Sequence, residues 1–358
     1  MEVVARDLLR AMIDHLPADM ELTAIVNHRG MEAAGPWQEL EMAVADVDIK
    51  SRPAWVAAEA VAVPRLAKRL RADVVHSLGN LSPVTSPMPR GVTVHDLIHH
   101  RARPAGLAAH SRITGTLVGL SARRADRVVA ISQQTSADLQ AVLGISRDQI
   151  DVIPNGVAPP TVAPTTESEL RSRLNLGDRP LIFSPSARQP HKNIDRLIDA
   201  HALLPASRPL LVLPGYTTGR DDLLRKRAGA LGIGADIRML GWIDQADLEG
   251  LYLASRALVF PSLYEGFGLP VIEAMLRGLP VACSGRGALA EVAGDAALMF
   301  DPENPAAIAA AISRLLADDQ LREHLITAGR KRAEQFTWER SAQGYFDTFR
   351  RLAAGASA

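Results

Sequence analysis

Short apolar segments alternate with helical stretches along almost the whole chain, and this alternation limits the possible folds more than any other feature. The helical stretches repeat their apolar residues at helical spacing, whereas the strand candidates are brief apolar runs between turn residues. The predicted strands are residues 22–26, 74–76, 92–95, 127–131, 150–153, 181–184, 210–213, 237–240, 257–260, 280–283 and 297–300. The pattern predicts an α/β fold with parallel sheets covered by helices on both faces.

The chain is long enough for two such domains. Its 358 residues exceed the size at which one hydrophobic core normally stops growing. The regular pattern breaks at residues 157–166, a segment rich in proline and threonine, which predicts a linker between two doubly wound halves. Ligands of such domains bind in a crevice at the carboxyl ends of the strands. We therefore expect the chemistry in the loops after strands 92–95, 181–184, 257–260 and 280–283.

Composition excludes several other classes of protein. Apolar residues make up 47% of the chain, and 40 basic side chains balance 40 acidic ones, which argues against disorder and against general nucleic-acid binding. The single cysteine, Cys283, excludes an intrachain disulfide framework and a zinc site with paired cysteines, and it fits a cytoplasmic protein. No apolar run reaches the ~20 residues of a membrane-spanning helix, and charged residues interrupt the N-terminal segment where a signal peptide would be apolar.

The densest motif lies at residues 257–275, where a buried strand leads through a glycine-bracketed loop into a helix. Gly266 and Gly268 allow a sharp turn and a close approach to a ligand, and Pro270 favours the start of a helix. The N–H groups of that helix start would bind an anion such as a pyrophosphate. Glu265 precedes this anion site, and Glu273 is expected in the first turn, so each carboxylate can accept hydroxyl hydrogen bonds from one end of a nucleotide sugar.

A second motif places two cations before a helix. Arg188 and Lys192 precede Asn193, a good N-cap residue, and the apolar period that follows predicts a helix. Positive charge is unfavourable at a helix N-terminus, so the pair suggests an anion between them, such as a diphosphate leaving group. A third motif, His95-Asp96, ends a strand and can hydrogen-bond a sugar or a phosphate.

Together these motifs resemble the retaining glycosyltransferases of family 4, which have the GT-B fold. The resemblance rests on EGFGLPVIE at residues 265–273 and on six further segments, which cover nearly the whole chain: VIPNGV at 152–157, Arg188 to Asn193, LGW at 240–242, LAEVAGDA at 289–296, GLPV at 278–281 and FTWER at 336–340. His95-Asp96 and Ile131-Ser132 are most similar to the bacterial mannosyl- and rhamnosyltransferases of surface-polysaccharide assembly.

The resemblance implies two Rossmann-like domains facing across a cleft. Residues 1–160, together with a final helix at 340–358 that returns to them, would form the acceptor side, and residues 161–339 would bind the donor. It implies transfer of a hexose from a nucleoside-diphosphate sugar, with GDP-mannose favoured, to a saccharide or lipid-linked acceptor. The anomeric configuration would be retained, no metal or other cofactor would be needed, and the departing phosphate would take the proton of the acceptor hydroxyl.

The resemblance also implies roles for single residues. Glu273 would bind the nucleotide ribose, and Glu265 would face the transferred sugar. Arg188 and Lys192 would hold the diphosphate, and His95 would contact the sugar. The remaining donor-binding residues are Gly266, Phe267, Gly268, Leu269, Gly241 and Trp242, with backbone N–H groups of 267–269 facing the diphosphate and sugar.

One departure from the family pattern concerns the first residues. Residues 4–16 carry the helical period of the first helix of such proteins, so the preceding strand and glycine-rich loop are expected to be missing. This leaves open a non-catalytic homologue that only binds a nucleotide sugar. Another alternative is a metal-dependent single-domain glycosyltransferase that chelates a divalent ion through Asp46 and Asp48, for which full activity in EDTA would be contrary evidence.

Charge is unevenly distributed in the first half. Residues 1–51 carry 4 basic and 10 acidic side chains, whereas residues 52–127 carry 12 basic and 4 acidic ones. The basic block is either a solvated face or a surface for an anionic acceptor or membrane headgroups. It leads us to expect a cytoplasmic protein with peripheral contact to the inner face of an anionic membrane.

Overall fold

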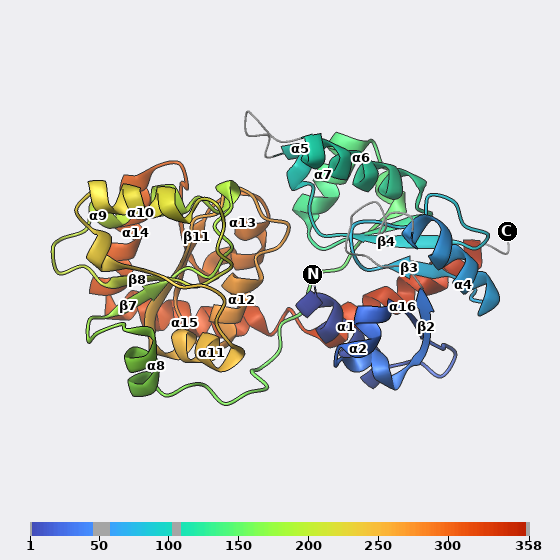
Figure 1. Ribbon diagram of the computed structural model, residues 1–358, viewed down its shortest axis with the longest axis horizontal. Helices are drawn as coiled ribbons and strands as arrows, with labels where there is room; N and C mark the ends of the chain where they lie inside the picture. The colour runs from blue at the N-terminus through green and yellow to red at the C-terminus, as the bar shows by residue number, and fades with distance from the viewer. Residues whose placement is uncertain (1, 46–57, 102–108, 356–358) are drawn as a thin grey trace. The chain divides into compact units, whose positions relative to one another are not determined.

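The protein is described by a computed structural model covering residues 2–45, 58–101 and 109–355, and it forms two compact units (Figure 1). Unit 1 consists of Met1–Gly156 and Phe336–Ala358, and unit 2 of Val157–Gln335. The sequence placed the two boundaries at 160 and 339, four residues beyond the observed 156 and 335. None of the described helices is both long and apolar enough to span a membrane.

Unit 1 contains two separate parallel sheets among its described residues. A two-stranded sheet pairs β1 with β2, and a four-stranded sheet has the order β3-β4-β5-β6. Its strands are β1 (Thr23–Asn27), β2 (Glu41–Ala45), β3 (Val75–Ser77), β4 (Arg90–Val94), β5 (Arg127–Ala130) and β6 (Ile150–Val152). The sequence did not predict β2, because its EMAVA segment lacks the β-branched run that marks the other strands.

The helices of unit 1 begin with α1, as the period of the first residues predicted. They are α1 (Glu2–Asp14), α2 (His28–Glu32), α4 (Val63–Arg69), α5 (Ile98–Arg101), α6 (Ala109–Arg124), α7 (Gln133–Leu143) and α16 (Trp338–Gly355). Helix α7 has both expected ends: the Ser132 side chain accepts from the N–H of Thr135, and Gly144 closes the helix with a left-handed backbone at φ 67°. The core lies between the four-stranded sheet and helices α6 and α7.

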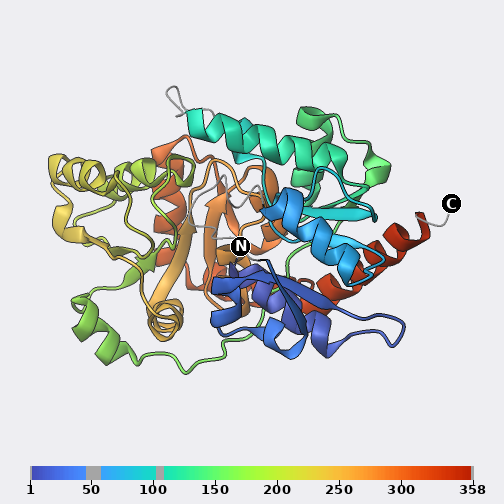
Figure 2. The same ribbon diagram turned by 45° about the vertical axis from the view of Figure 1, so that its right-hand side comes forward.

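The last helix, α16, returns to unit 1, as the sequence predicted for residues 340–352 (Figure 2). The Ser341 hydroxyl donates to the Pro154 carbonyl at 2.7 Å, and the Thr348 hydroxyl donates to the Asp151 carboxylate at 2.9 Å. The Tyr345 hydroxyl lies 2.8 Å from the hydroxyl of Thr93 on β4. Amphipathic helix α16 therefore covers an otherwise exposed side of a sheet that ends nearly 200 residues earlier in the chain.

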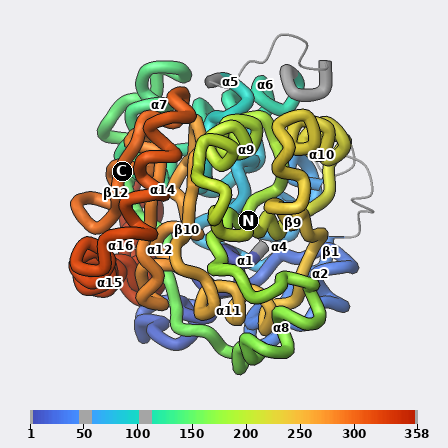
Figure 3. The backbone as a smooth tube through the Cα atoms, turned by 90° about the vertical axis from the view of Figure 1, so that its left-hand side faces the viewer, coloured from blue at the N-terminus to red at the C-terminus, as the bar shows by residue number. Residues whose placement is uncertain are grey.

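Unit 2 is built on one six-stranded parallel sheet with the order β12-β11-β10-β7-β8-β9. The strands are β7 (Leu181–Phe183), β8 (Leu210–Leu213), β9 (Ile237–Met239), β10 (Ser255–Phe260), β11 (Val281–Ser284) and β12 (Leu298–Phe300). All of them were predicted to within a few residues. Figure 3 shows β12 and β9 on opposite sides of the unit, as the sheet order requires.

Helices cover both faces of this sheet, so unit 2 is doubly wound, as its buried, continuously apolar strands predicted (Figure 1). Helices α9, α10 and α14 lie along one face, and α8, α11 and α15 lie along the other. The bounds are α8 (Glu167–Leu174), α9 (Ile194–Ala202), α10 (Asp221–Ala230), α11 (Gln245–Ala254), α12 (Leu269–Leu276), α13 (Gly287–Ala293), α14 (Pro305–Ala317) and α15 (Asp319–Ala333).

Candidate active site

The sheet of unit 2 has a topological switch point between its two central strands, β7 and β10. From β7 the chain winds through β8 to β9, and from β10 it winds the opposite way through β11 to β12. The loops that follow β7 and β10 therefore diverge at the carboxyl ends of neighbouring strands, which is where ligands bind in open α/β sheets. Both of the strongest sequence motifs lie in these two loops.

Lys192 and Glu265 meet at this switch point. Lys192 Nζ lies 2.7 Å from Glu265 Oε1, and both side chains are mostly buried. The backbone joins the same loops, since the N–H of Leu263 donates to the carbonyl of His191 at 2.7 Å. Lys192 Nζ also lies 5.5 Å from the centroid of the Phe260 ring. The structure thus brings together two predicted site residues, a cation and a carboxylate, 73 positions apart in the sequence.

Asn193 stands at the start of α9, but its side chain does not cap the helix as the sequence predicted. Its backbone is left-handed, at φ 60°, and the side-chain amide donates instead to the carbonyls of Pro261 and Pro302, at 3.0 and 2.7 Å. Asn193 therefore ties the loop after β7 to the loops after β10 and β12. This hydrogen bonding holds Lys192, its neighbour, beside Glu265.

Arg188 is not paired with Lys192, and the premise of two uncompensated cations before α9 is wrong. The guanidinium of Arg188 is buried with 1% exposed, and its Nε and Nη2 donate to Asp221 Oδ2 at 3.0 and 2.7 Å. Its remaining hydrogen bonds reach the carbonyls of Leu213 and Leu240. Arg188 accordingly links the ends of β8 and β9, and each of its three nitrogens donates to a group within the protein.

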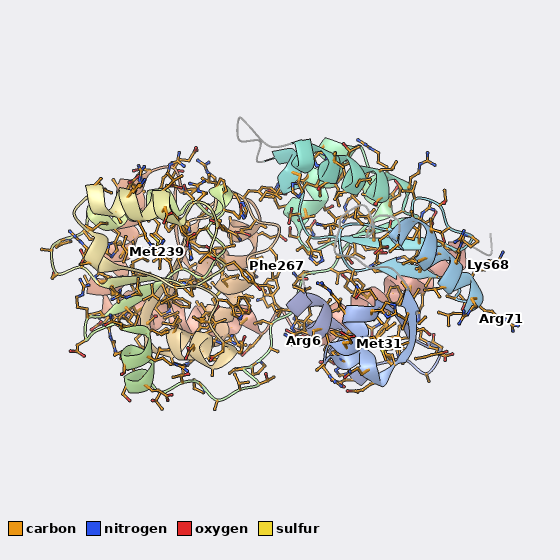
Figure 4. The ribbon with its side chains drawn as sticks, viewed as in Figure 1. Arg6, Met31, Lys68, Arg71, Met239 and Phe267 are labelled. Carbon is orange, nitrogen blue, oxygen red and sulfur yellow. The ribbon has the colours of Figure 1, made fainter. Side chains whose placement is uncertain are left out.

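The glycine loop after β10 is constrained at Gly268, the residue before α12. Its φ of +105° is one that side-chain-bearing residues rarely adopt, and an added Cβ would lie 2.4 Å from Leu289 Cδ2. Pro270 lies in the first turn of α12, as predicted. Gly266 is buried, and so is the ring of Phe267, which is labelled in Figure 4, so this loop presents backbone rather than side chains. Leu269 is the first residue of the helix.

Glu273 lies in the second turn of α12, not in the first, because the helix begins at Leu269 and its first turn contains no acidic residue. The favourable interaction of an acidic residue with a helix N-terminus therefore does not explain Glu273. Its Oε2 accepts a 2.8 Å hydrogen bond from the hydroxyl of Tyr252, a buried residue on α11. Burial and the nearby Glu273 carboxylate raise the pKa of Tyr252 well above its ordinary value, so its hydroxyl remains a donor.

Trp242, another predicted donor-binding residue, forms an exposed aromatic stack with Tyr216. The ring centroids are 4.7 Å apart and the planes are inclined by 25°, while 68% of Trp242 and 60% of Tyr216 remain exposed. Tyr216 follows β8 and Trp242 follows β9, and the N–H of Gly215 donates to the carbonyl of Gly241 at 3.1 Å. The stack thus lies just beyond the ends of β8 and β9, the two strands that the hydrogen bonds of Arg188 link.

His95 follows β4 in unit 1, and its ring is held from within that unit. Nε2 lies 2.7 Å from the carbonyl of Leu78, and since a carbonyl can only accept, Nε2 carries the proton. The backbone N–H of His95 donates to Asn80 Oδ1 at 2.7 Å. Burial lowers the pKa of His95, which keeps the ring neutral and leaves Nδ1 as an acceptor for a hydroxyl.

The structure describes part of the basic block, but not the two aspartates of the metal alternative. Asp46 and Asp48 lie outside the described residues, and among the described ones there is no group of three or more acidic, histidine or cysteine side chains able to hold a metal. On α4, and just after it, Arg65, Lys68, Arg69 and Arg71 are all exposed. Figure 4 shows Lys68 and Arg71 pointing outwards from this helix.

The side chains that support the predicted site residues belong to none of the sequence motifs. Asp221 balances Arg188, and Tyr252 contacts Glu273. Glu249 and Arg277 form a buried ion pair whose cation lies over the ring of Tyr252. Each belongs to an ordinary amphipathic helix or its end, and the only sequence feature that sets them apart is a polar group at an apolar position of the helical period.

Two curated mannosyltransferases are similar to parts of the chain. The O-antigen chain mannosyltransferase B of Escherichia coli is 44% identical over 154 residues, 42% of this chain and 40% of the relative. The serotype-specific mannosyltransferase WbdA of Escherichia coli is 31% identical over 239 residues, 64% of this chain and 29% of the relative. The matched regions therefore span less than half the length of these two relatives.

Solved structures resemble the chain over nearly its whole length. Sucrose-phosphate synthase from Thermosynechococcus elongatus has a TM-score of 0.78 at 23% identity, covering 99% of this chain and 93% of that one. HepE from Anabaena, in complex with UDP and glucose, has a TM-score of 0.74 at 21% identity, covering 98% and 95%. These likenesses show the GT-B fold.

The two units match two family descriptions in turn. Residues 1–159 match glycosyltransferase family 4, and residues 166–332 match the glycosyl transferases group 1. The first match ends close to the boundary between the units, and the two together leave residues 160–165 and 333–358 uncovered. With the Lys192–Glu265 pair and the glycine loop in unit 2, they establish that the chain belongs to family 4 of the glycosyltransferases, with the GT-B fold.

Proposed function

We propose that the chain transfers a hexose, with retention of anomeric configuration, from a nucleoside-diphosphate sugar to a saccharide or lipid-linked acceptor in polysaccharide biosynthesis. The observation that carries the proposal is the contact between Lys192 and Glu265 at the switch point of unit 2. A cation suited to a diphosphate and a carboxylate suited to sugar hydroxyls stand together where open α/β sheets bind ligands. The start of α12 follows in the same loop.

In this proposal the residues of unit 2 stabilise the leaving group and orient the sugar. Lys192 and the first N–H groups of α12 neutralise charge on the diphosphate as the bond between its oxygen and the anomeric carbon breaks. Glu265 accepts hydrogen bonds from the sugar, and Glu273 accepts them from the ribose. The acceptor oxygen bonds to the same face of the anomeric carbon, and its proton passes to the departing phosphate. No metal and no further cofactor takes part.

GDP-mannose is the favoured donor because two curated relatives are named as mannosyltransferases. The solved structure of HepE holds UDP and glucose, so the base and the sugar both have to be tested. The exposed Tyr216–Trp242 stack supports binding of a nucleobase, because aromatic faces stack on bases of any kind. A surface of this type favours binding without selecting one base.

A donor screen with product analysis tests the proposal. The protein is incubated with GDP-mannose, UDP-glucose or a dTDP-sugar and a lipid-linked saccharide, and release of nucleoside diphosphate is measured with and without EDTA. We expect turnover with one donor, undiminished by EDTA, and NMR of the product should show the anomeric configuration of the donor. Inversion would refute the retaining mechanism, and loss of activity in EDTA would refute metal independence. Donor binding without turnover would instead identify a non-catalytic sugar-nucleotide-binding homologue.

We also propose that unit 1 contacts the inner, cytoplasmic face of an anionic membrane through the exposed basic residues of α4. Arg65, Lys68 and Arg69 lie on one short helix, and each basic residue near an anionic surface contributes about 1 kcal/mol of binding, which salt screens. The test is co-sedimentation with anionic liposomes, which should weaken as salt rises and vanish with neutral lipid.

A matched pair of variants decides whether α4 is responsible. Changing Arg65, Lys68 and Arg69 together to serine should abolish sedimentation and slow transfer to a lipid-linked acceptor. The control changes Arg225 and Lys226, two exposed basic residues of α10 in unit 2, and should sediment like the unmodified protein. If the α4 variant also behaves like the unmodified protein, the basic block is only a solvated face.

A further inference from the structure

Two side chains that the sequence motifs do not include contact Glu273, one at its carboxylate and one at its backbone carbonyl. Tyr252, on α11, is 2% exposed and directs its hydroxyl at Glu273 Oε2, 2.8 Å away. Arg277, just after α12, donates from Nη1 to the backbone carbonyl of Glu273 at 3.0 Å. Its Cζ lies 4.8 Å from the centroid of the Tyr252 ring. Tyr252 therefore holds the side chain of Glu273, and Arg277, which contacts Tyr252, holds its backbone.

Arg277 is itself fixed by a buried carboxylate. Glu249 on α11 accepts from Arg277 Nε and Nη2, at 2.5 and 2.6 Å, and the two side chains are 2% and 8% exposed. A two-pronged pair of this kind defines the orientation of the guanidinium plane. The Tyr252 ring also contacts Phe183 of β7 edge to face, with centroids 4.9 Å apart. Tyr252 thus packs against both a strand of the sheet and the fixed guanidinium of Arg277.

We propose that Tyr252 is a positioning residue for nucleotide binding: its hydroxyl holds the Glu273 carboxylate in the orientation that accepts the ribose hydroxyls, and the Glu249–Arg277 pair holds Tyr252. The inference rests on the proposed role of Glu273 as the ribose ligand. A buried ion pair contributes little net stability but defines one arrangement, because each charge needs its partner in place. A carboxylate on a flexible side chain loses rotational freedom when it binds two hydroxyls, and prior orientation reduces that loss.

The experiment compares a ribonucleotide with its counterpart that lacks the ribose hydroxyls. Dissociation constants of GDP and 2′,3′-dideoxy-GDP, and of the matching uridine pair, are measured by calorimetry for the unmodified protein and Tyr252→Phe. We expect Tyr252→Phe to weaken GDP or UDP up to about tenfold, because the released Glu273 carboxylate then has to be ordered when the nucleotide binds. Binding of the dideoxy nucleotide should change less than twofold. Arg277→Lys, which keeps the cation but loses the two-pronged pair, should act in the same direction.

Two controls separate positioning from a merely structural role. Tyr345→Phe removes the hydroxyl of another buried tyrosine, bonded to Thr93 in unit 1, and should leave both dissociation constants unchanged. In a protein that already carries Glu273→Ala, adding Tyr252→Phe should have no further effect, because Tyr252 acts through Glu273.

The outcomes are distinct. If Tyr252→Phe weakens the ribonucleotide and the dideoxy nucleotide equally, or weakens neither, the positioning role is overturned while the role of Glu273 stands. If the unmodified protein itself binds both nucleotides equally well, the assignment of Glu273 to the ribose is overturned and the inference with it.

Discussion

Lys192 Nζ and Glu265 Oε1 form a 2.7 Å ion pair between the loops that follow the two central strands of unit 2. Each residue alone resembles an ordinary surface charge at the end of a strand. Together they place opposite charges at the point where the sheet reverses its winding, so a cation for a diphosphate and a carboxylate for a sugar lie side by side there.

Lys192→Gln should impair transfer far more than stability. Removal of one group that stabilises developing charge typically lowers kcat by about 100- to 1,000-fold. The ion pair is mostly buried, but glutamine can still donate a hydrogen bond to Glu265, so the free energy of unfolding should fall by only about 1–3 kcal/mol. Steady-state kinetics and urea unfolding measure the two effects. Near-normal kcat would contradict the role given to Lys192.

Glu265→Ala and Glu273→Ala should divide donor recognition between them. Glu273→Ala should weaken binding of a free nucleoside diphosphate, because its proposed ligand is the ribose. Glu265→Ala should leave the free nucleotide unaffected and weaken only the intact nucleotide sugar. Calorimetry with both ligands measures the difference, and equal effects of the two substitutions on the free nucleotide would show this division to be wrong.

Asp221→Asn should destabilise unit 2 and make its free energy of unfolding less dependent on pH in the acidic range. Arg188 is 1% exposed, and breaking a buried pair typically costs about 3–5 kcal/mol. The hydrogen bond from Arg188 lowers the pKa of Asp221 from 3.8 to about 2. Because the folded-state pKa is the lower one, this contribution is present above pH 4 and is lost as the pH falls towards 2.

Urea unfolding of the unmodified protein and the Asp221→Asn variant over that pH range measures the effect. The difference between them should shrink as the solution becomes more acidic. Asp222→Asn is the matched control, since this neighbour pairs with Arg225 on the exposed surface and should change stability by about 0.5 kcal/mol or less. A difference that stays constant from pH 7 downwards would contradict the prediction.

Gly268→Ala should destabilise the loop before α12 by about 1–3 kcal/mol and abolish binding of nucleoside diphosphates. The backbone at φ +105° disfavours a side chain, and the new Cβ would lie 2.4 Å from Leu289. Gly219→Ala, where an added Cβ has open space, is the control. Thermal unfolding and nucleotide titration test both statements, and unchanged binding by Gly268→Ala would refute the second.

The sequence by itself determined the strands of unit 2 and the loops that form its candidate site. Its six strands follow from local apolar runs, and each was predicted to within a few residues of its observed bounds. The glycine loop was located equally well, since Gly268 and Pro270 impose their conformations on adjacent residues. Such features depend on a few neighbouring residues and can be predicted without knowledge of the tertiary structure.

Only the tertiary structure decided which partner each charged or polar group takes. Arg188 and Lys192 stand four positions apart, yet one is neutralised by Asp221 on α10 and the other by Glu265 after β10. Asn193 holds two distant carbonyls where a helix cap was expected. The reason is physical: a buried polar group must find a hydrogen-bond partner wherever packing provides one, and packing brings together residues whose separation along the chain carries no information about their contact.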